Sequence, residues 1–453
     1  MNRAILLCAL AAAVGLPGVA GAITLTQLFT KGTFENAGVR VSYTDDADSS
    51  ATIGVQYRQL GTSQWRTGHP MIRIAGARFA SSLFQLSEDT TYEVRLVPED
   101  ADGVAVEFAQ PFQISTRSAE FPAGGGELYV DASAATSGEG SPEAPFRTIN
   151  QAARIARAGD VVHIMPGVYT EQVTPAASGT ETAWIHYRGA GEGVVLDGGL
   201  DLPTDTGWVE EAGVYRASFD REVNYVTLDT VRLYQHANLD SLRAGGDGIR
   251  GGYVTWRGSL YVKTPDGAPL EGRHLRVAVH TYGFLLDRRS HIVLQGLEIR
   301  HFDAANIRLN NAHHITIRQA RVHHSRQMIQ VRRRASTDNL IEDTSLWGTG
   351  VNQWPWEICH HDHDCSSNAI SLYDAGEGNV IRRNVIRGVF NGIYLGQWVD
   401  DYPEENALEN DVYDNVLQEI VDDGLEPECH AINLRMYGNH FRRVFSPISL
   451  API

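Results

Sequence analysis

Short strand-like segments recur along the last third of the chain at nearly constant spacing. Each has two apolar residues around a variable middle one, and the segments begin at Phe284, Ile307, Ile329, Ile370, Ile393, Leu425 and Ile448. Successive starts differ by 23, 22, 41, 23, 32 and 23 residues, so the base period is 22 or 23 residues with insertions of 19 and 9. A repeat this short has no room for a helical crossover. The pattern therefore predicts an all-β solenoid of stacked parallel strands.

The first 22 residues have the features of an export signal. An apolar run from Ala4 to Val14 follows Arg3, and Ala20-Gly21-Ala22 matches a small-residue cleavage site. We expect the mature chain to begin at Ile23, in a secreted or periplasmic protein. The alternative is an N-terminal strand or a membrane anchor, but the run is too short to cross a bilayer. We expect no membrane span elsewhere, and the net charge of -17 argues against a nucleic-acid partner.

Residues 23–118 predict a small β-sandwich. Short runs of alternating apolar and polar residues are broken by turn signals such as Asp45-Asp46-Ala47-Asp48. Val55–Arg58, Trp65 and Thr91–Arg95 resemble a fibronectin type III module, which implies a spacing or docking role. In that fold Tyr92 would lie at a corner and bond to nearby backbone. Residues 119–127 are a Gly-rich linker.

A helix is predicted near the start of residues 128–453. Thr148 can cap it, and Ile149, Ala152, Ala153 and Ala156 form one apolar stripe before Gly159. With the following strand at 161–164, this arrangement resembles the opening of secreted, pectin-lyase-like right-handed parallel β-helix proteins, in which a short helix covers the end of the solenoid core.

The C-terminal coils add to the resemblance to this family. Asn384, Asn415 and Asn439 recur at similar points of successive coils, and we expect them to stack as an asparagine ladder. No capping segment follows the strand that ends near Ile453. We therefore expect either a fragment or a last coil that something else covers.

The variable residues of the segments predict a long polar groove. Aligned by the period, the outward positions are Asn306, Arg308, Asn310, Gln330, Arg332, Ser371, Tyr373, Tyr394, Glu426 and Glu428. Residues 286–334 hold ten arginines against three acids, whereas residues 388–434 hold twelve acids and no Lys or Arg. The alternative explanation is that these charged residues lie in solvent-exposed turns of the solenoid and have no functional role. The segregation nevertheless favours an anionic polysaccharide as partner of a monomer, with Asn306, Arg308, Asn310 and Gln330 as binding residues.

The acidic end of this groove has two functional interpretations. Asp422, Asp423, Glu426 and Glu428 could bind Ca²⁺, which prefers several oxygen ligands. They could instead provide the acid and base of a glycoside hydrolase. A solvated edge without a role is the third possibility.

The 19-residue insertion contains the segment Trp354 to Cys365. Trp354 and Trp356 can stack on sugar rings, and His363 can act as a general base or bind a metal. A Cys359–Cys365 disulfide is plausible in an oxidising compartment. A zinc site formed by Cys359, His361, His363 and Cys365 is an alternative, and so is a folded lid without a chemical role.

The groove contains the groups that β-elimination of a uronate requires. Arg326 or Arg332 can neutralise the carboxylate, His324 or His363 can remove the C5 proton, and Tyr373 or Tyr394 can act as acid or second base. A C5 epimerase would use nearly the same groups. Glycoside hydrolysis by paired carboxylates and a non-catalytic, glycan-binding or adhesive solenoid are the other hypotheses.

The family resemblance bears on this chemistry. Several β-helix polysaccharide lyases use a lysine or arginine base with Ca²⁺, and the β-helix uronan epimerases have a histidine in an Asp-Pro-His-Asp motif. Here no lysine follows Lys263, which disfavours a lysine base, and Asp362-His363-Asp364 matches that motif only in part.

Overall fold

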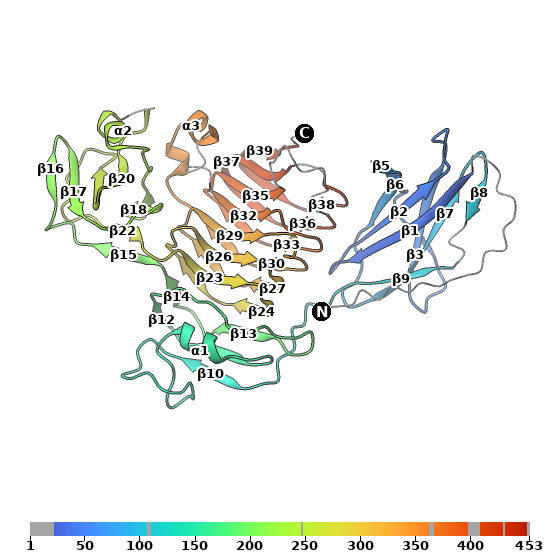
Figure 1. Ribbon diagram of the computed structural model, residues 1–453, viewed down its shortest axis with the longest axis horizontal. Helices are drawn as coiled ribbons and strands as arrows, with labels where there is room; N and C mark the ends of the chain where they lie inside the picture. Colours follow the sequence, from blue (N-terminus) through green and yellow to red (C-terminus); the bar gives the residue numbers. More distant parts are fainter. Residues whose placement is uncertain are drawn as a thin grey trace. The chain divides into compact units, whose positions relative to one another are not determined.

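The computed structural model describes residues 22–106, 110–245, 248–361, 367–396, 408–428 and 431–450. The chain divides into two compact units, residues 1–117 and 118–453 (Figure 1). No helix among the described residues is long and apolar enough to cross a membrane.

The first unit is a sandwich of two β-sheets. One sheet has the order β5 (Ile72–Ile74), β6 (Arg78–Leu83), β2 (Ala37–Thr44), β1 (Ile23–Gly32) and β8 (Val104–Val106). The other has the order β4 (Arg66–Thr67), β3 (Thr52–Gln59), β7 (Thr91–Glu99) and β9 (Phe112–Ser115). The pairs are antiparallel except β1 with β8. Val39, Ile53 and Val94 contribute to the core, and the Tyr92 hydroxyl accepts a hydrogen bond from the Ser87 backbone N–H at 2.8 Å.

The second unit is a right-handed parallel β-helix, as the sequence predicts, and its coils form three strips of strands. Strip 1 contains β10 (Glu127–Val130), β11 (Val161–Ile164), β13 (Ile185–Gly189), β24 (Ser290–Gln295), β27 (His313–Arg318), β30 (Leu340–Glu342), β33 (Val380–Arg382), β36 (Asp411–Tyr413) and β38 (Arg435–Tyr437). Strip 2 contains β12 (Gly167–Tyr169), β14 (Val194–Asp197), β25 (Glu298–Arg300), β28 (Arg321–His323), β31 (Ser345–Trp347), β34 (Val385–Arg387) and the first part of β37 (Val416–Pro427).

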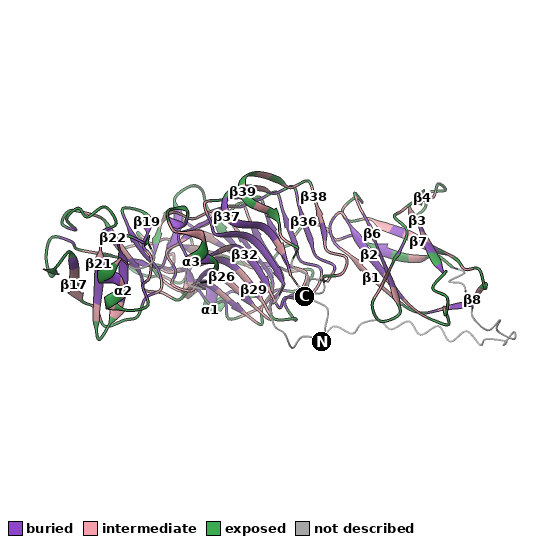
Figure 2. Ribbon diagram, turned by 90° about the horizontal axis from the view of Figure 1, so that it is seen from above, coloured by how far each residue is buried: buried purple, intermediate pink, exposed green. Residues whose placement is uncertain are grey.

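Strip 3 carries the repeat that the sequence shows. It contains β23 (Tyr282–Asp287), β26 (Ala305–Asn310), β29 (Gln327–Arg332), β32 (Asn368–Tyr373), β35 (Asn391–Gly396) and the last part of β37, which also pairs with β39 (His440–Ile448). The predicted register is confirmed at every coil, through Phe284, Ile307, Ile329, Ile370, Ile393, Leu425 and Ile448. All but the last of these side chains are fully buried, because alternate strand residues face the core. Figure 2 shows the strands of the solenoid as mostly buried.

Two predicted local features of the solenoid are confirmed. Helix α1 (Ile149–Ile155) has Thr148 as its N-cap and a capping box with Gln151, and its buried face joins the core. Asn384 donates to the side chain of Asn415, and Asn415 donates to that of Asn439, each at 3.0 Å.

Residues 198–281 form an inserted subdomain between β14 and β23, which the sequence did not indicate. One of its sheets has the order β15 (Gly199–Leu202), β22 (Leu275–Ala278), β18 (Val226–Leu228) and β19 (Val231–Arg232), and the other the order β16 (Val209–Glu211), β17 (Val214–Ser218), β21 (Ser259–Lys263) and β20 (Gly252–Trp256). Helix α2 (Leu239–Ala244) packs on the second sheet. The subdomain has its own hydrophobic core, which includes Leu233, Val262 and Val277.

A second insertion separates β31 from β32. Its described part contains the 3-10 helix η2 (Val351–Gln353) and helix α3 (Trp356–His361). Both insertions leave the solenoid between strip 2 and strip 3, so they rise at the same corner, separated by the coils of β25–β26 and β28–β29 (Figure 1).

Candidate functional site

The outer face of strip 3 brings together residues that are far apart in the sequence. One row of neighbours runs through Leu285, Arg308, Gln330, Ser371, Tyr394 and Glu426. The adjacent row runs through Asp287, Asn310, Arg332, Tyr373 and Gly396. Since neighbouring strands lie about 4.8 Å apart, these two rows form one mostly polar face, called the strip 3 face below. Ser371 and Tyr394 in its middle are buried.

One end of the strip 3 face is basic. Nη1 of Arg308 donates to Oε1 of Gln330 at 2.7 Å, and Nδ2 of Asn310 donates to Oδ1 of Asp287 at 2.6 Å. Burial lowers the pKa of the Arg308 guanidinium, and the positive charge of nearby Arg332 lowers it further. Two cations held this close attract an anion more strongly than either one alone.

Arg332 and two tyrosines occupy the middle of the face. The guanidinium carbon of Arg332 lies 4.8 Å from the ring centroid of Tyr373, and its buried Nε has no hydrogen-bond partner among the described residues. The Tyr373 ring stacks on Tyr394 with centroids 6.1 Å apart. Arg332 as a residue is half-buried, but this Nε atom is closed off from solvent.

Tyr394 connects this middle part to the acidic end. Its hydroxyl donates to Oε2 of Glu428 at 3.0 Å. Burial raises the pKa of Tyr394, and the charge of Glu428 raises it further. The predicted role of Tyr394 as a second base is therefore not supported, because its phenol stays protonated.

The acidic end holds a carboxyl group that is protonated at neutral pH. Burial raises the pKa of Glu426 to about 9, with further contributions from Glu428, Asp423 and Asp422. Nδ2 of Asn391 donates to Oε2 of Glu426 at 2.8 Å, and the neighbouring Glu428 carboxyl contributes to the raised pKa of Glu426. Asn391 is not among the predicted site residues, although its 23-residue spacing from Asn368 follows the repeat.

The four acids predicted to bind a metal do not form a ready-made site. Among the described residues, the carboxylates whose oxygens lie within 4.8 Å of one another as a group of three are Asp46, Asp48 and Asp100, in the first unit. At the solenoid, Asp422 instead accepts a hydrogen bond from Nε1 of Trp356 at 3.0 Å. Burial and then Asp422 raise the pKa of Asp423. The predicted Ca²⁺ site stays a prediction that this arrangement does not favour.

The turns that lead from strip 2 into strip 3 form one corner of the solenoid, against which the inserted subdomain packs. His324 lies in one of these turns and is buried. Nε2 of His324 lies 3.1 Å from the Thr230 carbonyl oxygen, and its Nδ1 faces Nδ1 of His323. Burial, then His323 and His301, lower the pKa of His324 to about 3. Both ring nitrogens are engaged and the ring stays neutral, which argues against His324 as the base.

Asn306 and Arg326 belong to the same corner. Asn306 was predicted to face the groove, but it is fully buried and donates to the His323 carbonyl oxygen at 2.9 Å. It is therefore not placed to contact a substrate. The positive charge of Arg326 acts on Asp303, which accepts hydrogen bonds from Asn224 of the subdomain at 2.6 and 2.7 Å.

The two predicted tryptophans pack against other parts of the second unit. Trp354 contacts Tyr234 of the subdomain edge-to-face, with centroids 5.3 Å apart, and Trp356 contacts Phe445 with centroids 5.4 Å apart. Cys359 is buried and disulfide-bonded. His363 and Cys365 lie in residues 362–366, outside the described part of the chain. Their predicted roles stay predictions.

Comparisons with known proteins give a partial family match and distant structural neighbours. A family model described as a protein of unknown function (DUF1565) matches residues 132–175, which include α1, β11 and β12. No curated protein matches the chain.

Three solved structures are similar in fold. They are XylC in complex with xylose (16% identity, TM-score 0.49, 72% of this chain), pectate lyase Pel9A (14%, 0.35, 70%) and a rhamnogalacturonan lyase (13%, 0.37, 70%). The matches cover 65%, 70% and 73% of those chains, so this chain spans less than two thirds of XylC. At these identities and TM-scores the likeness does not bear on activity.

Proposed function

We propose that this protein is an enzyme that acts on an acidic polysaccharide laid along the strip 3 face, by β-elimination or C5 epimerisation at a uronate. The observation that carries the proposal is the register of strip 3. It aligns Arg308 and Arg332, two tyrosines and a protonated carboxyl group on one face. A long face of this kind suits a polymer better than a small metabolite.

The first requirement of the reaction is to make the C5 proton acidic. A cation against the uronate carboxylate stabilises the negative charge that develops when C5 loses its proton. Arg332 fits this role because it is a half-buried cation on the strip 3 face, next to Tyr373 of the neighbouring coil. Arg308, one coil away, can hold the carboxylate of a neighbouring sugar.

The second requirement is a base and a source of protons. Tyr373 lies beside the Arg332 guanidinium, so its hydroxyl is placed next to the group that binds the carboxylate and is the candidate to take the C5 proton. The proton for the leaving oxygen can come from Glu426, which is in its acid form at neutral pH. The nearby Tyr394 hydroxyl donates to Glu428. An epimerase would return a proton to the opposite face of C5 instead.

Glycoside hydrolysis is less well supported by the same residues. A hydrolase places its two carboxyl groups on either side of the scissile bond, about 5 Å apart or more. Glu426 accepts from Asn391 and Glu428 accepts from the Tyr394 hydroxyl, so both carboxyl groups already have partners on the strip 3 face. No step of the proposed reaction is routed through Ca²⁺.

The proposal extends to the setting of the enzyme. We infer export of a monomer to the periplasm or the exterior from the sequence of residues 1–22, which lie outside the described residues. We also infer that the sandwich is a fibronectin type III-like spacing or docking module. The hydrogen bond at Tyr92 supports this inference.

The test is incubation with polygalacturonate, alginate and glycosaminoglycans in D₂O. A lyase generates a C4–C5 double bond that absorbs in the ultraviolet, and an epimerase incorporates deuterium at C5 without cleavage. New reducing ends without ultraviolet absorbance would favour hydrolysis. Retention on an immobilised glycan with none of these products would favour the binding or adhesive solenoid and contradict the proposal.

A further inference from the structure

The outer face of strip 2 carries a series of cations beside one tryptophan. Strands β28, β31, β34, β37 and β39 pair in register, so their outward residues form two rows along the solenoid. These two rows are called the strip 2 face below. One row runs through Arg321, Ser345, Val385, Val416 and His440, and the other through His323, Trp347, Arg387, Gln418 and Arg442.

The outward positions of the strip 2 face are cationic. They hold Arg321, Arg387 and Arg442 and no Asp or Glu, in a chain whose net charge is -17. Arg387 and Arg442 are exposed, and neither forms an ion pair within the described part of the chain. Arg321 pairs with Glu298 of the preceding coil at 3.2 Å, but its side chain is still 60% exposed.

The acids that border this face leave its positive charge in place. Asp343 and Glu419 lie in the turns on either side of strip 2, and they are paired with Arg383 and Arg443. Asp414, in the turn before β37, reduces the surplus by one charge. Since the arginines still outnumber the acids, an anion in solution is attracted to the strip 2 face.

Trp347 orients two of the arginines. Its ring is half-buried, and the guanidinium carbons of Arg321 and Arg387 lie 5.6 and 5.8 Å from its centroid. The other neighbour of the ring is His323, which stacks on it with centroids 4.0 Å apart. A guanidinium held against an aromatic ring keeps its N–H donors for an anionic group.

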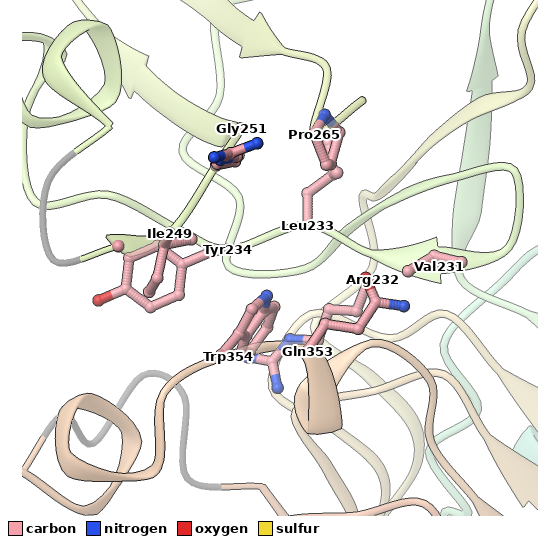
Figure 3. A pocket seen from close by; sticks show the side chains of 12 residues that line it. Val231, Arg232, Leu233, Tyr234, Ile249, Gly251, Pro265, Gln353 and Trp354 are labelled. Carbon is pink, nitrogen blue, oxygen red and sulfur yellow. The ribbon is translucent and has the colours of Figure 1, made fainter. Parts of the chain in front are cut away.

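The strip 2 face differs in kind from the cavity that the two insertions form. That cavity has a volume of about 230 Å³ and is lined by Tyr234 of the inserted subdomain and Trp354 of the second insertion. Figure 3 shows these two rings on facing ribbons. A cavity of this size holds a small molecule, whereas the strip 2 face extends over five paired strands and suits an extended ligand.

The positions of the arginines narrow the ligand to a polymer. Arg387 and Arg442 are two coils apart in one row, and Arg321 lies two coils before Arg387 in the other row. Two coils cover roughly 10 Å, which is close to the length of two linked sugar rings. Val385, 42% exposed, offers an apolar contact between the cations, and Gln418 offers a polar one.

We infer that the strip 2 face binds an acidic polysaccharide along the solenoid axis and so holds the polymer to the protein at a second surface. Its anionic groups would lie at Arg321, Arg387 and Arg442, and the C–H faces of its rings would contact Val385. This inference goes beyond the proposed function, with which it shares the class of polymer. It does not depend on the proposed reaction, because none of these residues belongs to the strip 3 face.

The test is the affinity of the whole protein for polygalacturonate and alginate, measured at two salt concentrations, with a neutral galactan as counterpart. The double variant Arg387→Glu/Arg442→Glu should bind the polyanions at least about tenfold more weakly, because it places like charges against them. Binding by the wild type should weaken as the salt concentration rises, since these cations are exposed.

The matched control is Arg216→Glu/Arg257→Glu, which changes the net charge of the protein by the same amount. Both arginines are exposed on the inserted subdomain, and Arg257 also lies against a tryptophan, 4.4 Å from the Trp256 ring centroid. We expect this control to keep the wild-type affinity within about twofold. Circular dichroism checks that both variants fold. If the Arg387→Glu/Arg442→Glu protein does not, Arg387→Gln/Arg442→Gln replaces it and should still weaken binding at least about threefold.

The outcomes separate this inference from the proposed function. Weaker binding by the Arg387/Arg442 variant than by the control, in a protein that turns over no uronan, would uphold the strip 2 face and refute the proposed reaction. In an active enzyme the same variant should raise KM for the polymer and leave kcat within about twofold. Turnover of a uronan with equal affinities of variant and control would overturn the strip 2 inference alone. Equal binding of the neutral galactan, or no binding of either polyanion by the wild type, would also overturn it.

Discussion

At the scale of single residues, Arg332 is the side chain whose loss should separate activity from folding. Arg332→Ala should reduce kcat/KM on the substrate polymer by about a hundredfold or more, the usual effect of removing one stabilising charge or donor. The free energy of unfolding should change by no more than about 1 kcal/mol, because the side chain lies outside the core. Steady-state kinetics and urea denaturation measure the two effects.

The matched control is Arg288→Ala. Arg288 is in the same basic segment, but its side chain is 78% exposed and pairs with the adjacent Asp287. Its loss should leave turnover within about twofold, because exposed ion pairs contribute little. Equal turnover by the Arg332→Ala variant and the wild type would mean that the substrate does not use the strip 3 face.

The raised pKa of Glu426 predicts how the stability of the protein depends on pH. Its pKa is about 9 in the folded protein against an ordinary value of 4.5, so the folded state binds the extra proton between these two values. The contribution of the Glu426 proton to the stability of the folded protein is fully present below pH 4.5, the ordinary pKa. It is lost as the pH rises through the folded-state pKa of about 9. Stability should therefore fall by up to about 1.4 kcal/mol per pH unit across this window. Glu426→Gln, which keeps the neutral form, should flatten the decrease in Tm between about pH 6 and 8. Parallel Tm curves for the wild type and the variant would contradict the assignment.

At the scale of structural elements, the asparagine ladder links the coils. Asn415 is fully buried, accepts from Asn384, and donates to Asn439 and to the Ile381 carbonyl oxygen. Asn415→Ala would leave buried donors and acceptors unpaired, so it should cost about 2–4 kcal/mol of unfolding free energy in urea denaturation. Asn439→Ala, at the half-buried last coil, should cost less. A loss below about 1 kcal/mol at Asn415 would show that water replaces the ladder.

The strands of strip 3 were predictable as elements, whereas the turns between them were not. Alternation of apolar and polar residues determines which side chains of a strand face the core, and the near-constant period determines which strands pair. Arg308 and Tyr394 therefore lie on the predicted face. No such rule covers a turn residue such as His324, whose surroundings depend on what packs against the corner.

At the scale of the whole molecule, the two units have separate cores. The sandwich core includes Val39 and Ile53, and the solenoid core includes Ile307 and Ile393. A protein of residues 118–453 should therefore fold and keep its turnover, because the strip 3 face and both insertions lie within it. Circular dichroism, thermal unfolding and the uronan assay measure this. A folded but inactive second unit would instead assign the sandwich a part in the reaction.

The sequence by itself determined the all-β solenoid, the register of strip 3 and the helix at its start, because these follow from periodicity and local capping. It also determined that Arg308, Arg332, Tyr373, Tyr394 and Glu426 share one face. Only the tertiary structure decided that Asn306 and His324 are buried, that Glu426 keeps its proton, and that two insertions enclose a pocket. Each of these depends on contacts between segments far apart in the chain, and burial by such contacts leaves no periodic signal in the sequence.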